Sequence, residues 1–128
     1  MKNKVYKLLF AAVIIVAVFF RFYDLAKVPP QPTVDEVSIG YNAYSILKTG
    51  ADEYGNKFPI LLRAYDDWRP ALYVYLVVPF VSFLGLDVLA VRLPSVILST
   101  LSVIAVYFLL KELFAGPNLK FEIRNFRL

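Results

Sequence analysis

Three long apolar blocks separated by polar segments constrain this chain more than any other feature of its sequence. The first block runs from Leu8 to Phe20 without a charge, and the second from Ala71 to Leu84. The third runs from Val88 to Leu110 and is interrupted only by Arg92 and Pro94. Hydrophobic residues make up 59% of the chain, whereas about 45–50% is usual for soluble domains. We therefore expect an all-α membrane protein.

About three transmembrane helices are expected, at about residues 6–25, 70–85 and 90–112. The first apolar block alone reaches only ~20 Å, which is less than the ~30 Å hydrocarbon core of a bilayer. Its flanks close the gap, because Lys7 and Arg21 can extend their charged ends to the membrane surface. A cleaved signal peptide is the alternative for so short a block. No small-residue cleavage site follows it, and this favours an uncleaved anchor.

The charges on either side of the first block indicate its orientation. Three lysines precede the block, whereas residues 21–69 carry six basic and seven acidic groups, a net charge of −1. Positive flanks tend to stay in the cytoplasm. We therefore expect a multi-pass protein of the cell membrane with a cytoplasmic N-terminus and segment 21–69 outside the cytoplasm. The polar tail, residues 117–128, is again basic, and simple alternation of three helices would place it outside, against the same rule. Either the last two blocks do not both span, or the tail is not native to the fold.

The outer loop, about residues 26–69, contains a predicted short helix. Pro29, Pro30 and Pro32 break the chain before it. Thr33, followed three residues later by Glu36, matches a capping box, and Gly50 is typical of a helix end. Apolar residues then repeat on one face: Val37, Tyr41 and Tyr44. This pattern predicts an amphipathic helix lying at the membrane surface.

Carboxylates are the strongest candidates for chemistry in this chain. The sequence contains no Cys and no His, so it lacks thiolate ligands and the usual base near neutral pH. The acidic pair Asp35-Glu36 lies just beyond the first apolar block, within reach of a lipid-linked substrate. The structural alternative is that both acids only stabilise the start of a helix. The basic residues are spread along the chain, which does not indicate nucleic-acid binding.

Five short motifs occur in order along the chain. They are Asp35-Glu36, Gly40–Leu47 with Thr49-Gly50, Asp52–Gly55, Arg69–Tyr73 and Arg92–Ser95. Together with the apolar blocks between them, they resemble the polyprenyl-phosphate-sugar glycosyltransferases of the protein O-mannosyltransferase and aminoarabinose-transferase type. The resemblance extends to about Gly116. It implies that residues 1–116 are the N-terminal part of a larger multi-helix glycosyltransferase fold.

The resemblance also implies a reaction and a set of site residues. Such enzymes transfer a sugar from a polyprenyl-phosphate carrier to an acceptor hydroxyl with inversion, the acceptor being a protein, a lipid or a glycan. Asp35 takes the role of general base, with Glu36 as its capping and orienting partner. Arg69 is expected to face the lipid phosphate, although the family usually has Lys-Pro-Pro where this chain has Arg69-Pro70-Ala71. Asp52 and Glu53 are expected to bind substrate on the acceptor side, or else to organise a turn.

Other roles and a rival function complete the expectations. The pair Asp66-Asp67 is expected on a solvated face, and Arg92 as an anchor at a helix end. We expect no cofactor, and the sequence leaves open whether a divalent metal is needed. The rival from another class is a small noncatalytic membrane protein that acts as an assembly partner. Three short helices cannot enclose a lipid phosphate, a sugar and an acceptor, so we expect the 128-residue chain to be inactive by itself.

Overall fold

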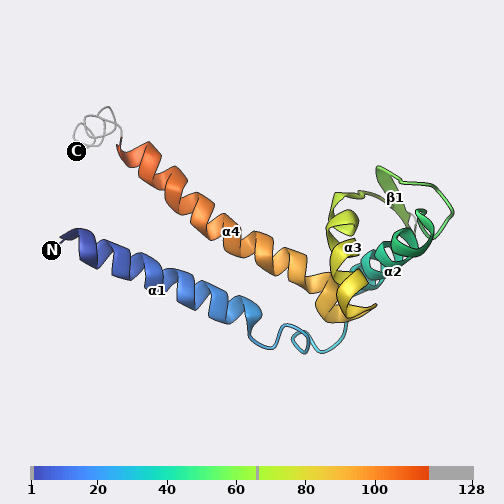
Figure 1. Cartoon of the computed structure of the whole chain (residues 1–128), viewed down its shortest axis with the longest axis horizontal. Coiled ribbons are helices and arrows are strands. Elements are labelled where there is room, and N and C mark those ends of the chain that lie inside the picture. Colours follow the sequence, from blue (N-terminus) through green and yellow to red (C-terminus); the bar gives the residue numbers. More distant parts are fainter. Residues whose placement is uncertain (1, 66, 116–128) are drawn as a thin grey trace. The chain divides into compact units, whose positions relative to one another are not determined.

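The computed structural model describes residues 2–65 and 67–115. Its elements follow the chain in the order α1 (Lys2–Phe22), α2 (Val34–Thr49), β1 (Leu61–Ala64), β2 (Asp67–Pro70), α3 (Leu72–Leu84) and α4 (Val88–Ala115) (Figure 1). The described residues form two compact units. Unit 1 comprises residues 2–21 and 98–115, and unit 2 comprises residues 22–97. The tail expected at residues 117–128 lies outside the described residues, and so does Asp66.

The described part of the chain is mostly helical, and one of its helices is long and apolar enough to cross a membrane. This helix is α4, over Val88–Phe114, and only 11% of its most apolar window is buried. The apolar parts of α1 and α3, Leu8–Phe22 and Leu72–Leu84, are shorter. At ~1.5 Å per residue α3 reaches ~20 Å, short of the ~30 Å core. Helix lengths therefore support one candidate span and do not support the expected three.

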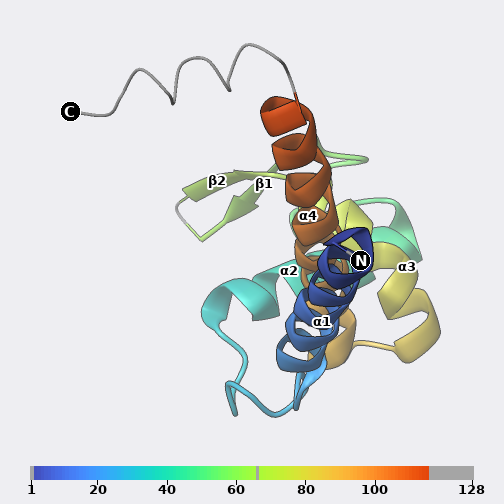
Figure 2. The same cartoon turned by 90° about the vertical axis from the view of Figure 1, so that its left-hand side faces the viewer.

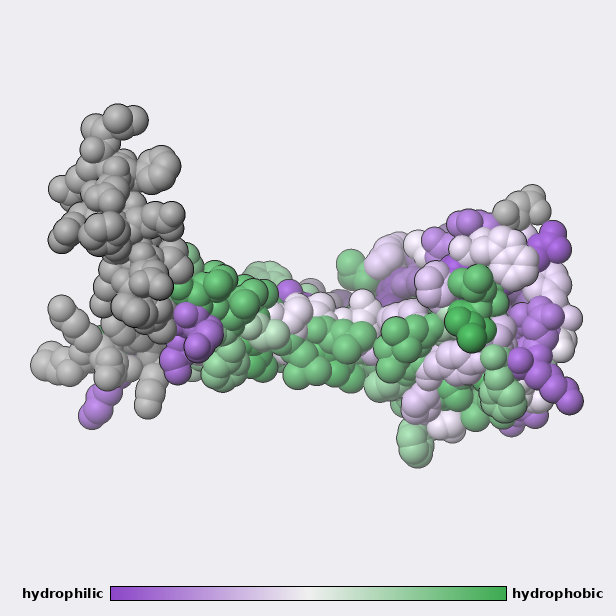
Figure 3. All heavy atoms as spheres, turned by 90° about the horizontal axis from the view of Figure 1, so that it is seen from above, coloured by the Kyte–Doolittle hydropathy of each residue, from purple (hydrophilic) through white to green (hydrophobic). Residues whose placement is uncertain are grey.

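Unit 1 contains α1 and the later part of α4. Within it the rings of Phe10 and Tyr107 stack with their centroids 3.8 Å apart, and Arg21 Nε donates to Ser99 Oγ at 3.1 Å. Apolar side chains gather on the surface of these helices (Figure 3). Exposed apolar surface of this extent is typical of a face that contacts lipid or another protein.

Helix α2 begins and ends as its sequence predicts. Thr33 Oγ1 accepts from the Glu36 backbone N–H at 3.2 Å, and Glu36 Oε2 accepts from the Thr33 N–H at 2.8 Å. These two bonds form the expected capping box. Gly50 closes the helix with a φ of 70°, and its N–H donates to the Ile46 carbonyl. The left-handed conformation at Gly50 explains the glycine there.

The core of unit 2 lies where α2 packs on α3. Ala43 and Ile46 of α2 are buried together with Val74, Val77 and Val81 of α3. The face of α2 that carries Val37, Tyr41 and Tyr44 is the exposed one. Helix α3, expected as a span, thus contributes one face to the core of this unit.

A two-stranded antiparallel hairpin departs from the all-α expectation. Strands β1 and β2 pair with Leu62 opposite Arg69 and Ala64 opposite Asp67 (Figure 2). The loop between them holds Tyr65 with a φ of 56°. Glycine or asparagine usually occupies such a position. Because Tyr occupies this position, the usual sequence signal of a hairpin turn is missing.

Candidate functional site

The structure brings two sequence-predicted site residues, Asp35 and Arg69, into direct contact. Arg69 Nη2 donates to Asp35 Oδ1 at 2.9 Å, across 34 positions of sequence. Asp35 lies in the first turn of α2, and β2 holds Arg69 in register opposite the buried Leu62. The Asp35 side chain is 73% exposed and that of Arg69 is 23% exposed. An exposed ion pair of this kind contributes only about 0–1 kcal/mol to stability. An anion that binds Arg69 more tightly than Asp35 does can therefore separate the pair.

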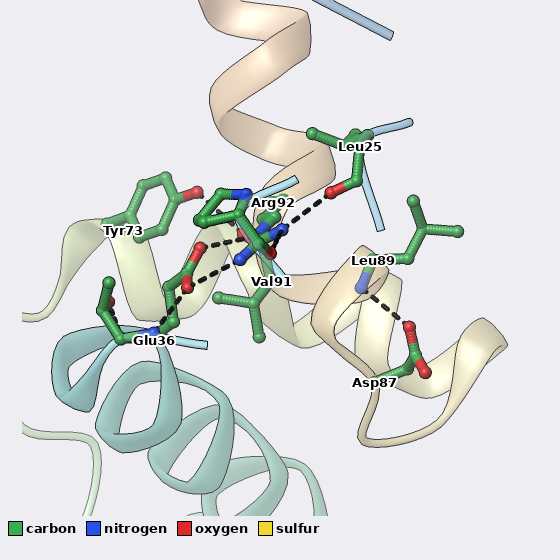
Figure 4. Close-up of polar contacts among 9 residues, drawn as sticks. Leu25, Glu36, Tyr73, Asp87, Leu89, Val91 and Arg92 are labelled. Carbon is green, nitrogen blue, oxygen red and sulfur yellow. Dashed lines mark hydrogen bonds and ion pairs between the residues drawn. The ribbon is translucent and has the colours of Figure 1, made fainter. Parts of the chain in front are cut away.

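Glu36 and Arg92 form a second, more enclosed ion pair (Figure 4). Arg92 Nε donates to Glu36 Oε1 at 2.6 Å, and Nη2 donates to Oε2 at 3.1 Å. The remaining nitrogen, Nη1, donates to the carbonyls of Leu25 at 2.9 Å and Pro29 at 3.1 Å. The Arg92 side chain is only 7% exposed. Arg92 lies near the start of α4, where an anchor at a helix end was expected, and its nitrogens bond inside unit 2.

This arrangement, which we call the Arg92 clamp, joins the loop before α2, the start of α2 and the start of α4. Its members are Arg92, Glu36, Leu25 and Pro29. Hydrogen bonds from Arg92 lower the pKa of the Glu36 carboxyl, while partial burial opposes the shift. Glu36 is thus held ionised and fully bonded, as a capping and orienting partner. Since Asp35 is its neighbour in the same turn, the clamp also fixes the position of Asp35.

Asp52 and Glu53 organise the loop after α2. The buried Asp52 accepts three hydrogen bonds, from the backbone N–H groups of Tyr54 and Asn56 and from the Asn56 side chain, at 2.8–3.0 Å. Glu53 exchanges two bonds with the buried Asn42: its N–H donates to Oδ1 at 3.1 Å, and its Oε1 accepts from Nδ2 at 3.0 Å. Among the described contacts, none joins either acid to Asp35 or Arg69. Asn42, which sequence reasoning missed, is what ties this loop to α2.

An apolar groove of about 180 Å³ lies beside the start of α2. It is lined by Pro32, Glu36, Val37, Gly40, Tyr41, Leu86, Asp87, Val88 and Val91. Gly40 lets Val91 approach α2 closely, since a Cβ at position 40 would lie only 3.0 Å from Val91 Cγ2. Within the described residues, no group of three or more acids is placed to hold a metal ion.

No family model matches this chain, and neither a curated protein nor a solved structure matches it.

Proposed function

We propose that this chain is the N-terminal part of a membrane glycosyltransferase that moves a sugar from a polyprenyl-phosphate carrier to an acceptor hydroxyl with inversion. The observation that supports the proposal most is the contact between Asp35 and Arg69. The motif resemblance assigns the role of base to Asp35 and the role of phosphate-binding cation to Arg69. Two functional groups needed in one reaction therefore lie at one place, outside the apolar helices.

The proposed reaction needs few groups. The acceptor oxygen attacks the anomeric carbon, Asp35 takes its proton, and the bond to the carrier oxygen breaks with its electron pair going to the phosphate. A phosphate leaves without being protonated, so the paired acid and base of an inverting hydrolase are not required. Arg69 instead balances the growing negative charge of the leaving phosphate by charge-assisted hydrogen bonds.

The ion pair itself suggests how the site is switched on. Arg69 Nη2 donates to Asp35 Oδ1 at 2.9 Å, so this carboxylate oxygen already has a partner when no donor is bound. An incoming lipid phosphate competes for the guanidinium, because Arg binds phosphate with two parallel hydrogen bonds. Asp35 is then released to accept the acceptor's proton. Donor binding would in this way prepare the base.

The substitution Arg69→Ala should raise the KM for the lipid-linked donor at least tenfold, because the phosphate loses its cation. Arg69→Lys should have a milder effect, since it keeps the charge and loses the planar fork. Transfer of a labelled sugar is measured in membranes from cells that carry the altered gene. Lys48→Ala, at the opposite end of α2, is the matched control and should behave as wild type. A normal donor KM for Arg69→Ala would remove this residue from the site.

The proposed membrane arrangement has α1, α3 and α4 within the bilayer, a cytoplasmic N-terminus, and residues 21–69 outside. The apolar parts of α1 and α3 are short, so in this arrangement both helices need their flanking residues and neighbouring helices to cross the bilayer. The charge contrast across the first apolar block supports this orientation.

A cysteine at Lys57 should react with a membrane-impermeant thiol reagent in intact cells. Lys57 is exposed in the loop after α2, and the chain has no cysteine of its own. Labelling of the Lys57 position only after lysis would reverse the orientation.

The noncatalytic assembly partner stays as a second candidate because one observation favours it. Glu36, Asp52 and Glu53 all make internal hydrogen bonds that a purely structural loop would also need. The transfer measurement separates the two functions, since an assembly partner would not depend on the charge of Asp35.

A further inference from the structure

A small pocket lined by tyrosines opens between α2, the loop after it and the hairpin. Its lining residues are Val37, Ser38, Tyr41, Glu53, Tyr54 and Tyr65, and its volume is about 120 Å³. We call it the tyrosine pocket. A cavity of roughly 150 Å³ holds one benzene ring. The tyrosine pocket is smaller, so it takes up one face or edge of a single six-membered ring and leaves the rest in solvent, and all three tyrosines are more than half exposed.

The polar groups of the tyrosine pocket are available to a ligand. Ser38 is only 8% exposed, and its hydroxyl makes no hydrogen bond within the described part of the chain. Every fully buried side-chain oxygen among the described residues has a hydrogen-bond partner, so the unbonded Ser38 oxygen is open to solvent. Glu53 is held in place through Oε1 by Asn42, which leaves Oε2 to accept a further bond. A donor and two acceptors thus face one small space.

Tyr65 reaches the pocket from the turn between β1 and β2. Its φ of 56° is the positive φ that a tight hairpin turn needs. Its side chain lines the tyrosine pocket.

The pocket lies one helical turn from the proposed base. Asp35 and Ser38 are three residues apart in α2, a spacing that places them on the same face of a helix. A ring bound at Ser38 would therefore extend toward the Asp35–Arg69 pair.

We propose that the tyrosine pocket binds a single sugar ring. The C–H groups of a sugar carry partial positive charge and suit the negative face of a tyrosine ring, while its hydroxyls match Ser38 and Glu53. The sugar comes either from the lipid-linked donor or from a glycan acceptor. The inference deepens the proposed function and rests on it only for the sugar's role in transfer.

Saturation-transfer NMR on the purified chain in detergent micelles tests the proposal. Aromatic protons are irradiated, and methyl hexosides and methyl pentosides are the probes. We expect saturation to pass from the aromatic protons of the protein to the C–H protons of at least one glycoside. Tyr41→Leu and Ser38→Val should each weaken its binding at least tenfold. Tyr44→Leu is the matched control, because Tyr44 lies in the same helix, is exposed, and does not line the pocket.

Several results would overturn the tyrosine pocket as a sugar site. The first is the absence of saturation transfer to every glycoside. The second is a loss of glycoside binding in Tyr44→Leu equal to that in Tyr41→Leu. The third is binding of tetramethylammonium, a cation that tyrosine rings also attract, in place of sugars. Circular dichroism of each variant shows whether it is folded, and Tyr41 is half exposed, so its loss leaves the core intact. If a polyprenyl-phosphate sugar displaces the glycoside, and Arg69→Ala weakens this displacement, then the pocket holds the sugar of the donor. If the glycoside and the polyprenyl-phosphate sugar bind at the same time, then the pocket holds the sugar of a glycan acceptor.

The same measurement keeps this inference separate from the proposed function. Glycoside binding requires neither a lipid carrier nor transfer, and Asp35→Asn should leave it unchanged. Sugar binding without any Asp35-dependent transfer would defeat the proposed function alone. Asp35-dependent transfer that is insensitive to Tyr41→Leu and Ser38→Val would defeat the tyrosine pocket alone.

Discussion

Asp35→Asn is expected to reduce sugar transfer by about 10²- to 10⁴-fold, the usual contribution of a general base. The amide has nearly the shape of the carboxylate but cannot take the acceptor's proton. Because the Asp35 side chain is 73% exposed and its ion pair is at the surface, the chain should fold and insert as before. Initial rates of transfer in membranes from cells carrying the altered gene give the measurement.

The control for this prediction is Asp67→Asn. Asp67 is an exposed acid in β2, close in sequence to Arg69, and its side chain accepts from the Trp68 N–H. It should transfer sugar at the wild-type rate. Near wild-type transfer by Asp35→Asn, with equal protein in the membrane, would show that Asp35 is not the base.

Arg92→Leu is expected to destabilise unit 2 by about 3 kcal/mol. Removing one partner of an enclosed ion pair leaves the other charge without compensation, which typically costs about 3–5 kcal/mol; we take the lower end because Glu36 is 22% exposed. The carbonyls of Leu25 and Pro29 also lose their donor. Urea unfolding in detergent, followed by circular dichroism, measures the change. Lys57→Leu, at an exposed lysine of the loop after α2, should change stability by roughly 0.5 kcal/mol or less.

The Arg92 clamp also predicts a dependence of stability on pH. The pKa of Glu36 is lowered in the folded chain, first by its hydrogen bonds with Arg92. A lowered carboxyl pKa contributes stability that is complete above the unfolded value of about 4.3 and is lost as the pH falls through the folded value. Wild type should therefore lose this contribution on acidification, and Arg92→Leu should lack it at every pH. Equal acid sensitivity of the two proteins would contradict the clamp.

Both ends of α2 could be predicted from sequence, because each is determined by residues a few positions apart. The capping box of Thr33 and Glu36 and the glycine end at Gly50 involve neighbours three or four residues apart, and the structure confirms them. The hairpin could not be predicted, because Tyr65 stands where glycine signals the turn. The three-span expectation came from apolar composition, which does not give the length of each helix, and among the described helices α4 is the one long and apolar enough to cross a membrane.

The candidate site could be predicted only in its parts. The motif order named Asp35, Glu36 and Arg69, but not that Asp35 and Arg69 touch, which depends on how the hairpin meets α2. The Arg92 clamp was missed because two of its partners are backbone carbonyls, and every residue has one. Ser38 gave no signal either, since a serine inside a helix is ordinary until its surroundings are known.

The stereochemistry of transfer tests the central claim most directly. A polyprenyl-phosphate sugar labelled with ¹³C at the anomeric carbon is supplied to membranes that contain the whole proposed enzyme, either as wild type or as the Asp35→Asn variant. NMR of the product then reports the anomeric configuration. The account predicts a product inverted relative to the donor, formed by wild type and nearly absent with Asp35→Asn. A product of retained configuration, or one formed equally by both proteins, would contradict it.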